Sequence, residues 1–206
     1  MRVGIDVDGI VAAFNGSYID LIKQHTGLEL PPESDTYPDE WSYEKAAMRK
    51  AGMAEDKISA TMKGMWAEIG ASNSFWATLP AYPEATSFLQ KLSSLMVDTY
   101  FITSRTGLTA KPQTEFWLMA HGLDHFPTVL VTQTRESTKG SICYALGLTH
   151  YIDDKDENCQ DVLKTSPATE CYMLRRPWNH KDICPRLDGL MDFMEVLRTD
   201  YAKEAA

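Results

Sequence analysis

The sequence predicts an α/β protein built on a doubly wound, Rossmann-like parallel sheet. Two features of the 206-residue chain support this fold class. Short apolar runs alternate with segments of helical periodicity, which is typical of a parallel sheet with helices on both faces. The runs are continuous rather than alternating, as expected for strands that are covered on both sides. Because hydrophobic residues make up 44% of the chain, such a sheet can bury a sizeable core.

Five apolar runs are expected to form a five-stranded sheet. They cover Val3–Ile5, Thr99–Ile102, Thr128–Val131, His150–Ile152 and Cys171–Leu174. Between and after them lie helical patterns with the usual proline and glycine boundary signals. These helices are expected from Pro83, from Pro112, and over Ser141–Leu146, Glu157–Leu163 and Leu190–Leu197.

The segment after the first strand breaks this alternation. It has no convincing strand pattern, and helices are instead expected over Ser17–His25, Tyr43–Ala51 and Glu55–Ile69. We therefore expect an α/β core of residues 1–13 and 83–206, with a small helical cap of residues 14–82 inserted after the first strand.

Composition excludes several classes of function. The net charge of −9 and the lack of a Lys/Arg-rich run disfavour binding to duplex nucleic acid or anionic membranes. No stretch approaches the roughly eighteen apolar residues of a membrane span. The N-terminus has no signal-peptide pattern, and the four cysteines have no paired spacing, so free thiols in the cytoplasm are expected. The oligomeric state stays open, with a homodimer among the alternatives.

Polar residues follow the predicted strands directly. They are Asp6 and Asp8 after the first strand, Thr103, Ser104 and Arg105 after the second, Lys139 at the next helix, and Asp153 and Asp154 after the fourth strand. Each alone is compatible with a turn or a helix cap. Together they meet at the carboxyl edge of the sheet, where ligands bind. Clustered carboxylates need a cation, and Mg²⁺ prefers oxygen ligands, so the pattern predicts a Mg²⁺-dependent phosphoryl-transfer site.

These residues resemble the four motifs of the haloacid dehalogenase (HAD) superfamily. The resemblance rests on DVDG at Asp6–Gly9, on Thr103 at the end of an apolar strand, on Lys139, and on the pair Asp153–Asp154. It implies a HAD-like fold. Within the superfamily, three segments resemble the 5'(3')-deoxyribonucleotidases, which also carry a small helical cap. They are DVDGIVAAF, SFWATLPAYPEA (Ser74–Ala85) and RRPWN (Arg175–Asn179).

Three residues depart from the deoxyribonucleotidase pattern. Ala13 replaces an acidic residue, Glu84 replaces a glycine, and Arg105 stands where the vertebrate enzymes carry proline. The departures leave the catalytic motifs intact and concern the nucleotide preference.

The resemblance implies a role for each carboxylate. Asp6 is the nucleophile that forms an aspartyl-phosphate, and Asp8 first protonates the leaving alkoxide and then activates water. Mg²⁺ binds Asp6, the backbone carbonyl of Asp8, and Asp153. Asp154 is either a water-mediated ligand or a residue that orients the other ligands.

The resemblance also assigns the phosphate contacts. Thr103 and Lys139 bind the transferring phosphoryl oxygens, with the amide of Ser104 as a helper. Arg105 is a candidate for contact with phosphate or sugar hydroxyls, and equally for a surface arginine at the start of the next helix.

Substrate selection is expected to lie in the cap. Phe14, Trp41, Phe75 and Trp76 are the candidates for stacking on a base, and simple packing explains each of them equally well. Tyr18 and Trp66 are weaker candidates. The expected function is hydrolysis of a nucleoside monophosphate, a small phosphomonoester. Two alternatives stay open: a phosphatase of the same fold acting on a sugar phosphate, and a binding module without catalysis.

Overall fold

Six parallel strands form a single sheet in this computed structural model, which describes residues 1–95, 97–122, 128–130 and 138–204. The strand order is β3-β2-β1-β4-β5-β6. The strands are β1 (Arg2–Ile5), β2 (Asp98–Thr103), β3 (Thr128–Leu130), β4 (His150–Asp153), β5 (Glu170–Leu174) and β6 (Arg186–Leu187). All five predicted strands are present, although Val131 lies outside the described residues. The sixth, β6, has only two residues, which is too short for a sequence pattern to reveal.

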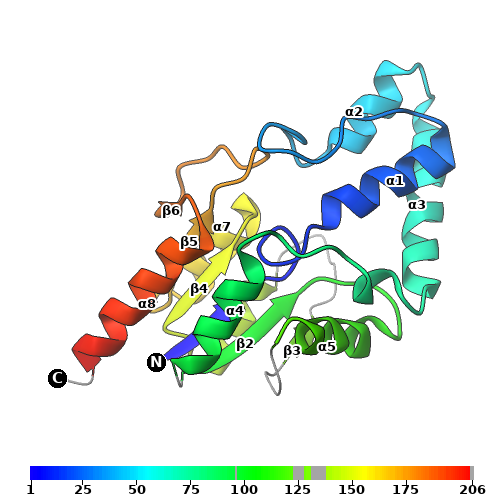
Figure 1. Cartoon of the computed structure of the whole chain (residues 1–206). Coiled ribbons are helices and arrows are strands. Elements are labelled where there is room, and N and C mark those ends of the chain that lie inside the picture. Colours follow the sequence, from blue (N-terminus) through cyan, green and yellow to red (C-terminus); the bar gives the residue numbers. More distant parts are fainter. Residues whose placement is uncertain (96, 123–127, 131–137, 205–206) are drawn as a thin grey trace.

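Helices cover both faces of the sheet, which confirms the doubly wound α/β class (Figure 1). In chain order they are α1 (Phe14–Thr26), α2 (Tyr43–Lys50), α3 (Glu55–Ala71), the 3₁₀ helix η1 (Phe75–Ala77), α4 (Ala85–Ser94), α5 (Ala110–Ala120), α6 (Lys139–Leu146), α7 (Asp156–Thr165) and α8 (Leu190–Glu204). One apolar cluster joins α4, α5 and α8 to the sheet, and a second joins α6 and α7 to its other face. None of the described helices is long and apolar enough to cross a membrane.

The strand order reverses between β1 and β4. Val3 pairs with His150 and Ile5 with Ile152, while Ile5 also pairs with Phe101 of β2 on the other side. In open α/β sheets a ligand crevice forms at such a reversal, beyond the carboxyl ends of the strands. The topology therefore places the site at the ends of β1, β2 and β4.

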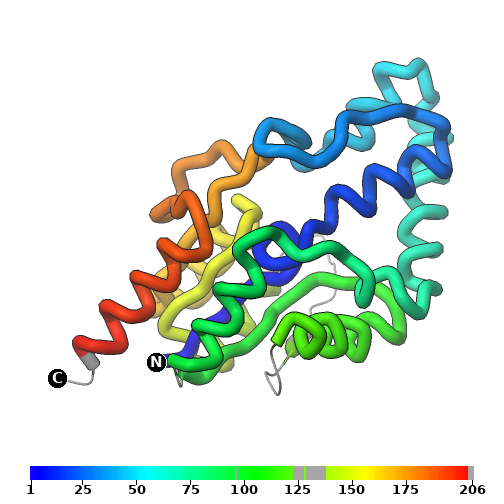
Figure 2. The backbone as a smooth tube through the Cα atoms, viewed as in Figure 1, coloured from blue at the N-terminus to red at the C-terminus, as the bar shows by residue number. Residues whose placement is uncertain are grey.

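The helices α1, α2 and α3 extend beyond this carboxyl end, away from the two termini (Figure 2). The two segments that connect them to the sheet are hydrogen-bonded to each other. The amide of Ala13 donates to Pro80 O at 2.8 Å, and the amide of Tyr82 donates to Val11 O at 3.0 Å. Buried residues of these helices join the same apolar cluster as β1 and α4. The division into a cap of residues 14–82 and a core remains a prediction.

Glu84, a departure from the family segment, has a structural role. Its Oε1 accepts a hydrogen bond from the backbone amide of Leu190 at 2.9 Å. Leu190 is the first residue of α8, so the carboxylate satisfies an amide that the helix itself leaves free. The contact joins the start of α4 to the start of α8.

The packing of α8 on α4 generates a stability prediction. Phe193 is fully buried, and its ring centroid lies 6.4 Å from that of Phe88. Truncating it in Phe193→Ala should lower the free energy of unfolding by about 3–5 kcal/mol, because a cavity opens between the helices. Urea unfolding measures this. The control Leu108→Ala removes a fully exposed side chain and should change it by less than about 0.5 kcal/mol.

Candidate active site

The ladder between β1 and β4 brings two carboxylates together. Beyond the last paired residues, Ile5 and Ile152, the amide of Asp6 donates to Ile152 O at 3.1 Å. The next residue of β4 is Asp153, so Asp6 and Asp153 leave neighbouring strands at the same level. The longer strand β2 continues to Thr103, whose side chain is buried.

A tight turn then carries the chain away from Asp6. The carbonyl of Val7 accepts hydrogen bonds from Val11 and Ala12, both at 2.9 Å. Gly9 has a φ of +80°, and a β-carbon at this position would lie 2.0 Å from Asp154 Oδ2. Only glycine permits this approach, which explains the glycine of the DVDG motif.

Lys139, the first residue of α6, lies between the two carboxylates. Its Nζ is 2.8 Å from Asp6 Oδ2 and 2.7 Å from Asp153 Oδ2, and the side chain is 2% exposed. Burial raises the pKa of Asp6 to about 7, with Lys139 opposing the rise and Asp153 adding to it. Burial lowers the pKa of the Lys139 ammonium, but the negative charges of Asp153 and Asp6 outweigh this effect, and the pKa is raised overall.

The two aspartates at the end of β4 have different surroundings. Asp153 Oδ1 accepts from the amide of Lys155 at 2.9 Å and from Asn158 Nδ2 at 2.9 Å. Its Oδ2 accepts from Lys139 and, at 2.5 Å, from Tyr151 Oη. Asp154 Oδ2 accepts from Trp178 Nε1 at 2.8 Å, but its buried Oδ1 has no hydrogen-bond partner within the described chain. A water molecule or an ion can satisfy a buried oxygen of this kind.

These carboxylates fit a divalent metal ion that prefers oxygen. One ligand oxygen from each of Asp6, Asp153 and Asp154 lies within 4.8 Å of the other two. Burial raises the pKa of Asp154 well above its usual range, and the charges of Asp153 and Asp6 add to the rise. A cation offsets both effects, and carboxylate oxygens are the donors that Mg²⁺ prefers.

Asp8 is held by Arg105. The guanidinium makes a two-pronged ion pair, with Nη2 2.7 Å from Asp8 Oδ1 and Nε 3.0 Å from Asp8 Oδ2. Its Nη1 donates to Thr114 Oγ1 at 2.9 Å, and its Cζ lies 4.9 Å from the ring centre of Trp76. The Arg105 side chain is fully buried, which excludes the surface-arginine interpretation.

A cavity of about 440 Å³ lies between the sheet edge and the helices α1–α3. At the sheet end its lining includes Asp6, Asp8, Thr103, Ser104, Lys139 and Asp154. At the helical end its aromatic lining is Phe14, Tyr18, Trp41, Tyr43, Trp66 and Trp76. Charged and hydroxyl side chains from four separate segments therefore meet an aromatic surface in one cavity.

The predicted substrate residues divide into two groups. Phe14, Trp41, Trp76 and Ser104 line the cavity, whereas Phe75 and Arg105 do not. Phe75 packs edge-on against Trp76, at 5.1 Å between ring centroids. Arg105 instead pairs with Asp8, since a buried guanidinium needs a carboxylate partner. Its contact with phosphate or sugar stays a prediction.

Several residues of the site escaped the sequence analysis. Trp178 and Asn179 hold Asp154 from the RRPWN segment, the latter by donating to its backbone carbonyl at 2.8 Å. That segment was used only as a family signature. Trp66, by contrast, was a weaker candidate from the sequence, because its helical spacing is equally typical of a buried core residue. It lines the cavity and stacks on Phe14 at 6.0 Å between centroids.

Comparison with solved structures identifies the fold. A haloacid dehalogenase-like family hydrolase from Streptococcus pneumoniae has a TM-score of 0.64 and 13% identity, over 95% of this chain and 97% of that one. A putative beta-phosphoglucomutase from Thermotoga maritima has a TM-score of 0.60 and 12% identity, over 96% and 98%. A HAD family hydrolase from Deinococcus radiodurans, solved with bound phosphate and sodium, has a TM-score of 0.60 and 13% identity, over 95% and 94%.

The chain therefore has the HAD-like fold, as the motifs predicted. Neither a protein-family model nor a curated protein sequence matches it. The fold is shared at low identity, and the resemblance to the deoxyribonucleotidases rests on the sequence segments alone.

The buried charges generate a prediction for Lys139. In protein freed of divalent cations, Lys139→Met should lower the free energy of unfolding by about 3–5 kcal/mol, because two buried carboxylates lose their shared cation. Urea unfolding at mildly alkaline pH measures this. The control Lys111→Met breaks an exposed pair with Glu115 and should cost less than about 1 kcal/mol. Equal losses in the two variants would contradict the structural role of Lys139.

Proposed function

We propose that this protein is a Mg²⁺-dependent phosphomonoester hydrolase that works through an aspartyl-phosphate. The convergence of Asp6, Thr103, Lys139 and Asp154 on one cavity carries the proposal. A carboxylate nucleophile, a hydroxyl, an ammonium and a candidate metal ligand are the groups that phosphoryl transfer requires. The HAD-like fold adds support, since the S. pneumoniae and D. radiodurans proteins of this fold are named hydrolases.

Asp6 acts as the nucleophile. Its Oδ1 accepts from the amide of Val7 at 2.8 Å, and its Oδ2 faces Lys139. These contacts hold the carboxylate in one orientation and favour its ionised form. Attack forms the bond between Asp6 and phosphorus, and the alkoxide leaves. Water then attacks the phosphorus and releases phosphate and free Asp6.

Asp8 transfers the protons. It lines the cavity two residues after the nucleophile, and its carboxylate is 20% exposed. The two-pronged ion pair with Arg105 fixes the position of the Asp8 carboxylate, which accepts a proton from the attacking water in the second step. In the first step the protonated Asp8 carboxyl gives its proton to the leaving alkoxide, and the proton taken from water in the second step restores it. Arg105, which holds Asp8, is a positioning residue for both steps.

The metal is held by the carboxylate cluster. Asp154 Oδ1 has no hydrogen-bond partner among the described residues, which favours it as a direct ligand beside Asp6 and the carbonyl of Asp8. Both oxygens of Asp153 already accept hydrogen bonds, so in this assignment Asp153 serves chiefly to orient Lys139. When bound, Mg²⁺ neutralises charge on the phosphoryl group, while Thr103, Ser104 and Lys139 bind its other oxygens.

A nucleoside monophosphate is the substrate class that the cavity favours. A base needs a flat apolar surface with a few polar groups. Trp66 and Tyr18 offer rings, tilted at 36° to each other, at the cap end of the cavity. Asn15 and the buried Glu44 also line it and supply hydrogen-bonding groups for a base or a sugar.

A sugar phosphate is the second candidate. The T. maritima protein of this fold is named a putative beta-phosphoglucomutase. The polar groups of Asn15 and Glu44 suit sugar hydroxyls as well as a base. A panel of 5'- and 3'-nucleotides and sugar phosphates, assayed with Mg²⁺, separates the candidates. Good turnover of a sugar phosphate with negligible turnover of every nucleotide would reject the nucleotide proposal.

The nucleophile assignment predicts the effect of Asp6→Asn. Phosphate release should fall to background, because an amide cannot form the acyl-phosphate. Phosphate release from the best panel substrate measures this, and circular dichroism checks the fold. The same change at exposed Asp20, in Asp20→Asn, should leave activity intact. Activity retained in Asp6→Asn would refute the nucleophile assignment.

The metal assignment predicts the effect of Asp154→Asn. The Mg²⁺ concentration that gives half of the maximal thermal stabilisation should rise at least about 10-fold, because the cluster loses a ligand charge. Differential scanning fluorimetry over a Mg²⁺ titration measures this without any substrate. Asp20→Asn again serves as the control. An unchanged titration would show that Asp154 does not contribute to metal binding.

Base stacking predicts the effect of Trp66→Leu. Loss of one stacking ring costs about 1–3 kcal/mol, so kcat/KM for nucleotides should fall by roughly 5- to 160-fold. Turnover of a small phosphomonoester without a ring should change little. Steady-state kinetics on both substrates measures the difference. The control Phe116→Leu alters an exposed aromatic on α5. Equal losses on both substrates would contradict stacking.

A further inference from the structure

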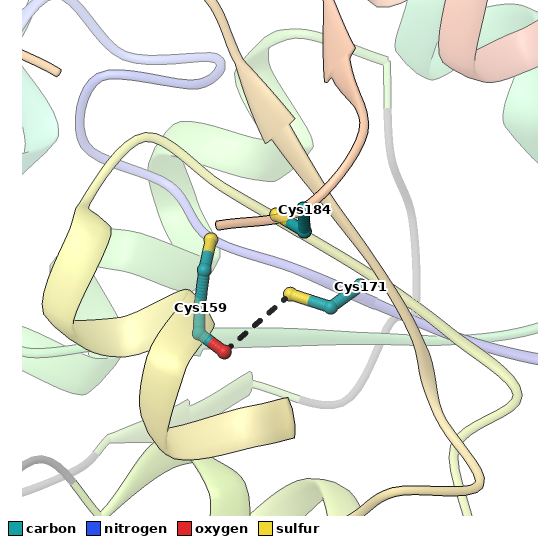
Figure 3. A group of neighbouring side chains, drawn as sticks. All are labelled: Cys159, Cys171 and Cys184. Atoms are coloured by element: carbon teal, nitrogen blue, oxygen red, sulfur yellow. Dashed lines mark hydrogen bonds between the residues drawn. The ribbon is translucent and has the colours of Figure 1, made fainter. Parts of the chain in front are cut away.

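Three cysteines gather on the face of the sheet that α6 and α7 cover. Cys159 lies in α7, Cys171 lies in β5, and Cys184 lies in the segment just before β6. They are 0%, 3% and 8% exposed. Their sulfur atoms come from three separate elements and approach one another (Figure 3). The proposed phosphoryl-transfer chemistry uses none of them.

The spacing of the sulfur atoms suits a metal ion. All three lie within 4.8 Å of one another, so a single point lies within about 2.8 Å of each of them. A zinc–thiolate bond is about 2.3 Å long. A shift of roughly 0.5 Å per sulfur, which a small side-chain rotation supplies, would bring all three into bonding distance.

The donor set selects the kind of ion. Among the described residues, no histidine or carboxylate oxygen belongs to this group of potential ligands. Thiolates prefer soft ions such as Cu⁺ and Zn²⁺, whereas Mg²⁺ prefers the oxygens of the aspartate cluster. The chain therefore carries two groups of potential ligands with opposite preferences.

Two further observations concern charge and access. Arg186 follows Cys184 by two residues, and its buried Nε has no hydrogen-bond partner within the described chain. Its guanidinium can offset the negative charge that remains when three thiolates bind one divalent ion. Both residues line a surface cavity of about 600 Å³, which offers a path from solvent to the sulfur of Cys184.

We propose that Cys159, Cys171 and Cys184 form a binding site for one thiophilic metal ion of the Zn²⁺ or Cu⁺ class. Bound metal would tie α7, β5 and the segment before β6 together. Because α7 begins at Asp156, shortly after the Asp153–Asp154 pair in the chain, the bound ion would also stabilise that end of β4. The proposal does not depend on the hydrolase function.

The test uses the reduced full-length chain with excess Mg²⁺, which occupies the carboxylate cluster. Cd²⁺ is the probe, because thiolate ligation to Cd²⁺ produces an ultraviolet charge-transfer band that oxygen ligation does not. We expect the band to saturate at one Cd²⁺ per chain and to decrease as Zn²⁺ displaces it. Zn²⁺ should also raise the midpoint of thermal unfolding.

Matched variants assign the site. Cys171→Ser and Cys184→Ser should lose the band, whereas Cys143→Ser, which alters a fully buried thiol of the same apolar cluster outside the ligand group, should keep it. Circular dichroism separates lost binding from lost folding. If a variant does not fold, native mass spectrometry of the unaltered chain with Zn²⁺ still decides the matter.

Two outcomes would overturn the proposal. One is an unaltered chain, with its thiols shown to be free by alkylation, that binds no Cd²⁺ or Zn²⁺ at micromolar concentrations. The other is a band that persists in Cys171→Ser and Cys184→Ser and disappears in Cys143→Ser. Since none of these measurements requires a substrate, a failure here leaves the hydrolase proposal untouched.

Discussion

The burial of three carboxylates beside one ammonium is the constraint on which the site depends. Asp6, Asp153 and Asp154 sit at the reversal of strand order, where the sheet offers little water to stabilise charge. Lys139 is placed between two of them because α6 begins at that residue. The remaining negative charge favours a cation, and Oδ1 of Asp154 has no hydrogen-bond partner in the part of the chain that the structure describes.

Neighbouring residues hold this aspartate cluster in position. Gly9 allows the first turn to approach Asp154, and Arg176 donates to Gly9 O at 2.6 Å from the other side. Trp178 holds Asp154 itself. The RRPWN segment after β5 thus supports the turn after β1. A low-dielectric site of this kind can direct its charges at a substrate with little reorganisation.

The three departures from the family pattern differ in their structural consequences. Glu84 caps α8 through the amide of Leu190, and Arg105 pairs with Asp8. Ala13 precedes α1 without a side-chain cap, and its amide instead bonds Pro80 across the connection to the helical segment. Substitutions of this kind affect how Asp8 and the helices are held, and they leave Asp6 and Lys139 in place.

Sequence alone determined five of the six described strands, the motifs, and the edge of the sheet at which the motifs meet. Val3–Ile5 and His150–Ile152 are apolar runs whose following aspartates must emerge together in a parallel sheet. Only the tertiary structure decided which atoms face which. Three features depend on contacts between segments far apart in the chain. Arg105 turns inward to Asp8, and three distant cysteines meet. Among the described residues, both carboxylate oxygens of Asp153 have hydrogen-bond donors, whereas Oδ1 of Asp154 has none. Local periodicity reports burial and strand direction, but it carries no information on the partner of a polar side chain.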